Sequence, residues 1–182
     1  MTLSPVCHNT RPAGVLPEQE AAAFDLLERL GIDYDRVSHE AAFNMELCAE
    51  VGRALDVSVC KNLFLCNRQK TNFYLLMMPG DKPFKTKELS HQLGIARLSF
   101  ASPEDMEQYL DCTPGSSSIM GLANDTESKV QLLMDEDIKA GEYLGCHPCI
   151  NTSSLKLRTA DVLETFLPAV HHEPIFVHLT GE

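Results

Sequence analysis

Several features that would assign this chain to a familiar class are missing from its sequence. No amino-terminal segment joins basic residues to an apolar run, and the longest apolar run, Phe73 to Met78, is too short to cross a bilayer. We therefore expect a soluble, cytoplasmic protein with no membrane partner. Internal repeats and low-complexity tracts are also absent. The 182 residues are 44% hydrophobic, which suffices for one globular domain without disulfides or metal.

Positive charge is scarce as well. The chain contains 15 Lys and Arg residues but 26 Asp and Glu residues, which gives a formal net charge of -11. This balance argues against general attraction to nucleic acid, DNA included, because phosphate binding depends on Lys and Arg displacing counterions. Residues 61–97 are the exception, with a local charge of about +5. This stretch forms either a basic face on an acidic body or simply a solvated helix and hairpin.

The cysteine content does not fit a disulfide framework. Seven cysteines are an odd number spread through the chain, so we expect free thiols in a reducing compartment. The Cys146-x-x-Cys149 spacing leaves open a thiol redox role with a low thiol pKa, or a zinc site with His147. However, the pair lies late in the chain, before a strand-like segment, and further ligands at zinc spacing are lacking. We expect no metal and no cofactor.

Hydrophobic periodicity predicts a mixed α/β domain. Helices are predicted over residues 17–30, 45–55, 85–93, 102–110 and 159–167. Strands are predicted over residues 34–38, 57–66, 72–79, 129–134, 155–157 and 175–179, the second and third forming a hairpin. Helices and hairpins do not alternate as βαβ units, so we expect a single domain on a largely antiparallel sheet with flanking helices. Residues 1–16 lack periodicity and predict a loosely ordered lead-in to a domain spanning 17–182.

Two segments carry residues suited to a functional site. Lys61 interrupts an apolar strand, and burying an unpaired ammonium is costly, so either it has a function or it simply points outward. Gly115 and Gly121 bracket a serine-rich loop whose N–H groups and hydroxyls could surround a carbonyl or a ribose; an ordinary surface loop is the alternative. The loop lacks a Walker lysine, and no Gly-x-Ser-x-Gly elbow is present. His171 and His172 have no partners at metal spacing and are expected to be exposed.

Four sequence segments, or blocks, add a further observation through their order and spacing. They are Lys61-Asn62-Leu63-Phe64-Leu65, Leu93 to Ser102, Thr113 to Asp125, and Gly145-Cys146-His147-Pro148 with Asn151-Thr152. Together they resemble the free-standing prolyl-tRNA editing proteins, relatives of the editing domain inserted in bacterial prolyl-tRNA synthetases, over about residues 20 to 180. The resemblance implies a curved sheet, no metal, and hydrolysis of the ester joining a wrong amino acid to tRNA(Pro). The alanine-specific branch is the closest match.

The resemblance also implies roles for individual residues. Lys61 is expected to be catalytic and Arg97 to contact the acceptor stem, with Lys70 as a second tRNA contact. The residues expected to bind substrate are His39, Asn62, Gly115, Ser116, Gly121, His147 and Pro148. Ile119-Met120 departs from the Pro-Phe that family members often carry, which leaves a deacylase for Cys- or Ser-tRNA(Pro) as an alternative. A catalytically silent module that binds tRNA or prolyl-tRNA synthetase is a further alternative.

Overall fold

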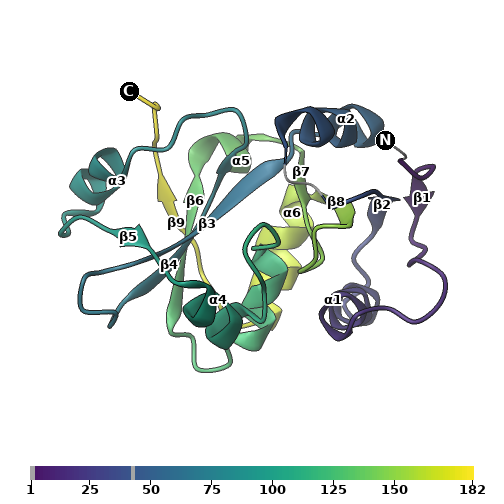
Figure 1. Cartoon of the computed structure of the whole chain (residues 1–182), viewed down its shortest axis with the longest axis horizontal. Helices are drawn as coiled ribbons and strands as arrows, with labels where there is room; N and C mark the ends of the chain where they lie inside the picture. Colours follow the sequence, from purple (N-terminus) through teal and green to yellow (C-terminus); the bar gives the residue numbers. More distant parts are fainter. Residues whose placement is uncertain (1–2, 42–43) are drawn as a thin grey trace.

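The computed structural model describes residues 3–41 and 44–182 (Figure 1). Its strands are β1 (Cys7–His8), β2 (Tyr34–Ser38), β3 (Cys60–Cys66), β4 (Phe73–Pro79), β5 (Ser99–Phe100), β6 (Val130–Asp135), β7 (Tyr143–Cys146), β8 (Ser153–Arg158) and β9 (Ile175–Val177). Its α-helices are α1 (Glu18–Arg29), α2 (Met45–Leu55), α3 (Thr86–Leu93), α4 (Pro103–Leu110), α5 (Glu136–Ala140), α6 (Thr159–Asp161) and α7 (Leu167–Ala169). A 3-10 helix, η1 (Ile119–Asn124), precedes β6, and a π-helical segment, η2 (Val162–Phe166), joins α6 to α7.

The strands form two hydrogen-bonded sheets rather than the one sheet that we expected. Sheet A has the order β1-β2-β8-β7 and is antiparallel throughout. Sheet B has the order β5-β3-β4-β6-β9, in which β4 pairs with β6 and β6 with β9 in parallel. Strands β4 and β6 can run parallel because the long connection between them carries α3, β5, α4 and η1, and the connection from β6 to β9 likewise carries the elements from α5 to α7. The mixed α/β class, with antiparallel pairing and flanking helices, is confirmed.

One backbone bridge joins the two sheets. Val59, just before β3, pairs in parallel with Gly145 of β7, and the Gly145 N–H donates to the Ser58 carbonyl over 3.2 Å. A Cβ on residue 145 would lie 3.1 Å from the Val59 Cα and 3.2 Å from the Ser58 oxygen. Glycine therefore permits this close approach of two backbones.

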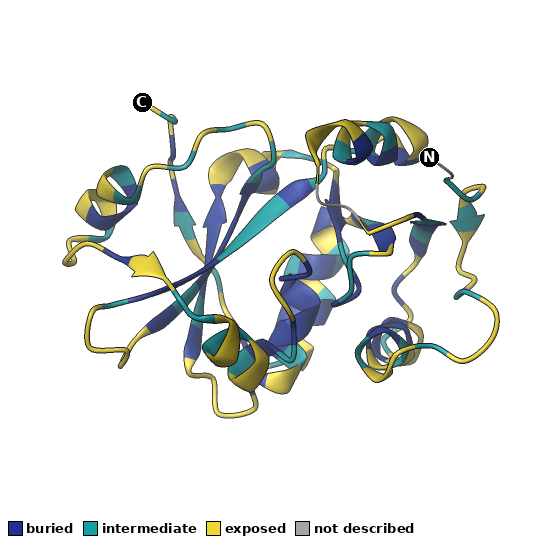
Figure 2. Ribbon diagram, in the orientation of Figure 1, coloured by how far each residue is buried: buried dark blue, intermediate teal, exposed yellow. Residues whose placement is uncertain are grey.

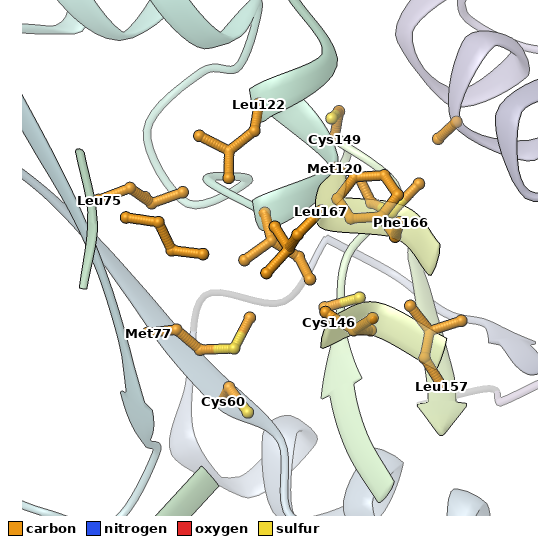
Figure 3. Close-up of a cluster of buried hydrophobic side chains, with 14 of the residues drawn as sticks. Cys60, Leu75, Met77, Met120, Leu122, Cys146, Cys149, Leu157, Phe166 and Leu167 are labelled. Carbon is orange, nitrogen blue, oxygen red and sulfur yellow. The ribbon is translucent and has the colours of Figure 1, made fainter. Parts of the chain in front are cut away.

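The main core lies between the sheets. It includes Phe24 of α1, Phe64 of β3 and Phe166 of η2, and Figure 3 shows Cys60 and Met77 on the side of sheet B and Leu157 on the side of sheet A. Strands β4 and β6 are accordingly buried over most of their length, whereas the first half of β3 is only partly buried (Figure 2). A second cluster lies under α3, and a third lies under α2. Within the described ranges 3–41 and 44–182, no helix combines the length and the apolar character that a bilayer crossing requires.

The start of α4 confirms the predicted helix signal. The Ser102 hydroxyl accepts a hydrogen bond from the Asp105 N–H over 3.1 Å, and the Asp105 carboxylate accepts one from the Ser102 N–H. This reciprocal capping satisfies amide groups that a helix leaves unpaired at its amino end. The hairpin β3–β4 and helix α2 also lie where the sequence predicted them.

The amino-terminal segment is more regular than its sequence predicted. β1 pairs with β2, and the Arg11 guanidinium contacts the carboxylates of Asp25 and Glu28 on α1, each over 2.7 Å. A strand as short as β1 shows no periodicity, so its pairing depends on contacts that only the folded chain provides.

The expected exposure of His172 is wrong. Its Nε2 lies 2.8 Å from an Asp125 carboxylate oxygen, and both side chains are only 3% exposed. The Asp125 carboxylate also accepts the N–H groups of Lys129 and Val130, over 3.0 Å and 2.8 Å. This pair ties the segment after α7 to the start of β6, whereas the neighbouring His171 is exposed, as predicted.

Candidate active site

The structure brings the first and fourth sequence blocks together where the two sheets meet. Val59 and Gly145 pair in a parallel bridge, so the two chain segments run in the same direction there. Lys61 lies two residues after Val59, and His147 lies two residues after Gly145. Strands β3 and β7 are in contact at this point. Residues that are far apart in the sequence therefore lie on adjacent segments.

Lys61 lines an open cleft of about 820 Å³ beside α2, with Gly80 and Asp81 among its walls. The side chain is partly buried, and its Nζ donates to the Lys82 carbonyl. Burial lowers the pKa of Lys61, and the nearby Asp81 carboxylate partly opposes this effect. The ammonium thus lies at the wall of a cleft that a ligand can enter.

Asn62 does not share the orientation of Lys61. Successive side chains in a strand point to opposite faces, so Asn62 lies on the face of Phe64 while Lys61 lies on the face of Leu63. The Asn62 Oδ1 is buried and has no hydrogen-bond partner among the described residues. The Lys-Asn pair therefore does not present both side chains to one ligand group in this conformation.

A chain of hydrogen bonds fixes the two histidines of the site. His39 is buried, with Nδ1 2.6 Å from the Glu40 carbonyl and Nε2 2.8 Å from the Ser154 hydroxyl. His147 Nδ1 lies 2.9 Å from the Ser153 carbonyl and 3.4 Å from the Ser154 hydroxyl, and the ring centroids of His39 and His147 are 6.3 Å apart. Because Nδ1 of each ring faces a carbonyl, Nδ1 carries the proton, and His147 Nε2 in the neutral ring offers a lone pair.

The serine loop is tied to the His-Pro block through a residue that the sequence did not single out. The Ser118 hydroxyl donates to the His147 carbonyl over 2.5 Å, and it accepts the Met120 N–H over 3.1 Å. Ser116 instead bonds Thr113 and stabilises its own turn. The Ser117 hydroxyl is buried and unpaired within residues 3–41 and 44–182. The position of Ser118 in the predicted loop was the one sequence signal that could have indicated its role in the site. No sequence feature indicated a role for Ser154.

The two loop glycines have different structural roles. Gly115 is exposed and has φ +87°, a left-handed conformation that favours glycine. Gly121 is buried, and a Cβ there would lie 2.7 Å from the Leu110 carbonyl oxygen and 3.1 Å from the Cys112 sulfur. Any side chain at position 121 would therefore force the loop away from α4.

The expected tRNA contacts lie away from the cleft. Arg97 and Lys70 are both exposed near the turn of the β3–β4 hairpin, where Lys70 contacts Asp105 over 3.3 Å. Lys61 lies at the opposite end of β3, six residues from Asn67, or roughly 20 Å along an extended strand. A ligand that touches both regions must therefore be long.

The structure argues against the thiol redox alternative. That alternative predicted a low thiol pKa, but burial raises the pKa of Cys146, and contact with Cys112 together with burial raises that of Cys149. Pro148 lies buried between them, and all seven cysteines of the described chain are free thiols. Cys146 and Cys149 accordingly belong to the main core (Figure 3).

We expect His147 to make folding depend on pH. Burial lowers the pKa of its ring, the bond to Ser153 partly opposes this, and the charge of His39 lowers it further. The unfolded state, with an ordinary pKa of about 6.5, therefore binds a proton before the folded state does. Stability should be full above about pH 6.5 and fall on acidification toward the lowered pKa, by about 1.4 kcal/mol for each tenfold difference in proton affinity.

Urea unfolding at pH 7.5 and at successively lower pH would measure this effect. His147→Gln should flatten the pH dependence. Identical pH profiles for wild type and His147→Gln would contradict the assignment.

Comparison with known proteins defines the class to which this site belongs. Residues 39–165, more than half of the chain, match the family model of the aminoacyl-tRNA editing domain, and the chain belongs to this family. "Prolyl-tRNA editing protein ProX" of Acetoanaerobium sticklandii is 26% identical over 145 residues, 80% of this chain and 88% of that protein. "Prolyl-tRNA synthetase associated domain-containing protein 1" of Danio rerio is 29% identical over 155 residues, 84% of this chain and 83% of that protein.

Two further similarities bear on the fold and on the link to synthetases. "Proline--tRNA ligase" of Albidiferax ferrireducens is 27% identical over 135 residues, which are 65% of this chain and 23% of that protein. A crystal structure of a candidate trans-editing enzyme for prolyl tRNA synthetase superposes with a TM-score of 0.66, covering 91% of this chain and 100% of that one at 13% identity. The resemblance inferred from the four sequence blocks is thus confirmed, and the fold is that of an editing domain.

Proposed function

We propose that this protein is an aminoacyl-tRNA deacylase that hydrolyses Ala-tRNA(Pro) and spares Pro-tRNA(Pro). The observation that carries the proposal is the backbone bridge that places the Lys61 and His147 segments side by side, next to the cleft that Lys61 lines, in a chain of the editing-domain family. The names of its prolyl-tRNA editing and synthetase-associated relatives support tRNA(Pro) as the substrate and prolyl-tRNA synthetase as a partner. Alanine as the amino acid comes from the sequence blocks.

The chemistry needs little beyond positioning and charge stabilisation. An aminoacyl ester is already activated, so the protein must place a nucleophilic water and stabilise the oxyanion that forms. The Lys61 ammonium supplies the positive charge for this oxyanion. The neutral His147 ring, held by Ser153, directs Nε2 toward a hydroxyl of the terminal ribose or toward the water.

Several backbone groups of the serine loop are already engaged in hydrogen bonds within the loop. We expected its backbone N–H groups to bind the ester carbonyl, but those of Ser116, Met120 and Gly121 already donate within the loop. Ile119 and Met120 pack into the main core. The loop therefore holds the His147 backbone in place through Ser118.

Selection against proline must rest on exclusion by size. A hydrophobic pocket gains only about 1–3 kcal/mol from an added methylene, which is too little to choose the smaller substrate by attraction. A cleft that admits alanine and rejects the proline ring spares the correct product without any specific contact.

Release of labelled amino acid from charged tRNA(Pro) tests the proposal. Wild-type protein should free alanine from Ala-tRNA(Pro) well above the spontaneous rate and leave Pro-tRNA(Pro) intact over the same period. Ser-tRNA(Pro) and Cys-tRNA(Pro) in parallel reactions would reveal a different amino acid preference. Efficient cleavage of Pro-tRNA(Pro) would refute the size-exclusion argument.

A silent binding module is the second candidate, and the name of the Danio rerio relative favours it, since it describes association with prolyl-tRNA synthetase. This candidate predicts tight binding to the synthetase or to tRNA(Pro) with no release of amino acid from any charged form. The same reactions, combined with a binding measurement, separate the two functions.

A further inference from the structure

An exposed aromatic ring at the edge of sheet B has no role in the chemistry described above. Phe100 on β5 is 63% exposed, and Figure 2 shows β5 as an exposed strand. Phe84 contacts the ring edge to face, with centroids 6.1 Å apart and ring planes at 73°. Phe84 thereby holds one side of the ring and leaves much of it open. Open aromatic rings beside cations are the usual platforms for unpaired nucleic-acid bases.

The cations around Phe100 are available to an external anion. Arg97 lies three residues before Phe100, Lys85 follows Phe84, and Arg68 lies in the turn of the β3–β4 hairpin, all of them exposed. None of these three takes part in an ion pair with another residue in the described parts of the chain. In a chain of net charge -11, this local excess of positive charge complements phosphate.

Phe100 lies on the same side of sheet B as Lys61. Alternation along β3 places Lys61, Leu63 and Leu65 on one face, and Leu65 lies directly opposite Phe100. Four residues separate Lys61 from Leu65, about 13 Å along the strand. This is the length of about four stacked nucleotides at roughly 3.4 Å each. The spacing matches a short unpaired strand that ends at Lys61.

We propose that Phe100 stacks on a base in the unpaired 3′ end of the charged tRNA while Arg97 and Lys85 contact its phosphates. The proposal rests on the function proposed above, since it places the ester end of that strand at Lys61. The strand then runs from the cleft toward the hairpin end of sheet B, outside the cluster that buries Leu65. This arrangement explains why the expected tRNA contact Arg97 lies far from the cleft.

A second aromatic surface is less suited to this role and supplies a matched control. Tyr143 on β7 is 37% exposed, but the Lys156 ammonium lies 4.4 Å from its ring centroid and the Arg158 guanidinium carbon lies 5.5 Å from it. These cations already cover the ring through cation–π contacts, so a base would have to displace them. Phe100 has no such cation among the described contacts.

Tryptophan fluorescence tests the stacking directly, because the chain contains no tryptophan. The fluorescence of the Phe100→Trp variant should be quenched by an RNA microhelix with an unpaired 3′ overhang. The same microhelix with a blunt end should not quench it. Tyr143→Trp should not respond. Adding Arg97→Gln to Phe100→Trp should weaken the response and reduce its salt dependence. Absent quenching at position 100, or equal quenching at position 143, would overturn the proposal.

Kinetics then separate this proposal from the proposed function. Phe100→Ala should raise KM for Ala-tRNA(Pro) by roughly 5- to 150-fold with kcat unchanged, and Phe100→Tyr should restore it. Quenching at position 100 without alanine release by wild type would support the docking surface and refute the deacylase. Alanine release with unchanged KM in Phe100→Ala would overturn the docking surface alone.

Discussion

Lys61→Met is expected to lower the rate of alanine release from Ala-tRNA(Pro) by roughly 10²–10³-fold, the usual loss when an oxyanion-stabilising group is removed. Methionine preserves the unbranched shape of the side chain but removes the charge and the donor to the Lys82 carbonyl. The loss should appear in kcat, because the oxyanion exists only in the transition state. Single-turnover release of labelled alanine measures it.

Lys129→Met is the matched control for this substitution. The Lys129 side chain is exposed, and its ammonium pairs with the exposed Glu127 carboxylate over 2.8 Å. It should retain the wild-type rate, and thermal unfolding should show that Lys61→Met is folded. A folded Lys61→Met protein with wild-type turnover would remove Lys61 from the mechanism.

Asp125→Ala is expected to reduce the free energy of unfolding by about 3 kcal/mol or more. Both ring nitrogens of His172 face oxygen acceptors, with Nδ1 2.6 Å from the Val170 carbonyl and Nε2 2.8 Å from Asp125. Removing the carboxylate leaves a buried donor on His172 and frees the N–H groups of Lys129 and Val130. Urea unfolding at neutral pH measures the loss.

Two companion variants make this result specific. Asp125→Asn keeps an acceptor for the backbone and should cost less than Asp125→Ala. Glu127→Ala, at a side chain that is 70% exposed two residues away, should cost little. Equal stability of Asp125→Ala and Glu127→Ala would show that the buried pair contributes nothing.

The secondary structure could largely be predicted from the sequence because its signals are local. Helix α2 occupies the predicted residues 45–55, and the β3–β4 hairpin flanks its polar turn as expected. The capping residues at Ser102 lie within one helical turn and need no tertiary contact to be recognised. The opposite orientations of Lys61 and Asn62 also follow from strand alternation.

Family membership could likewise be inferred from the sequence, because the order and spacing of the four blocks can be recognised without knowing the fold. Only the tertiary structure decided how the blocks form a site. The bridge between Val59 and Gly145, the bond from Ser154 to His39 and the bond from Ser118 to the His147 carbonyl join residues 29 to 115 positions apart. The burial of His172 against Asp125 has the same origin. Such contacts depend on which strands pair and which faces meet, and periodicity over a few residues carries no information about either.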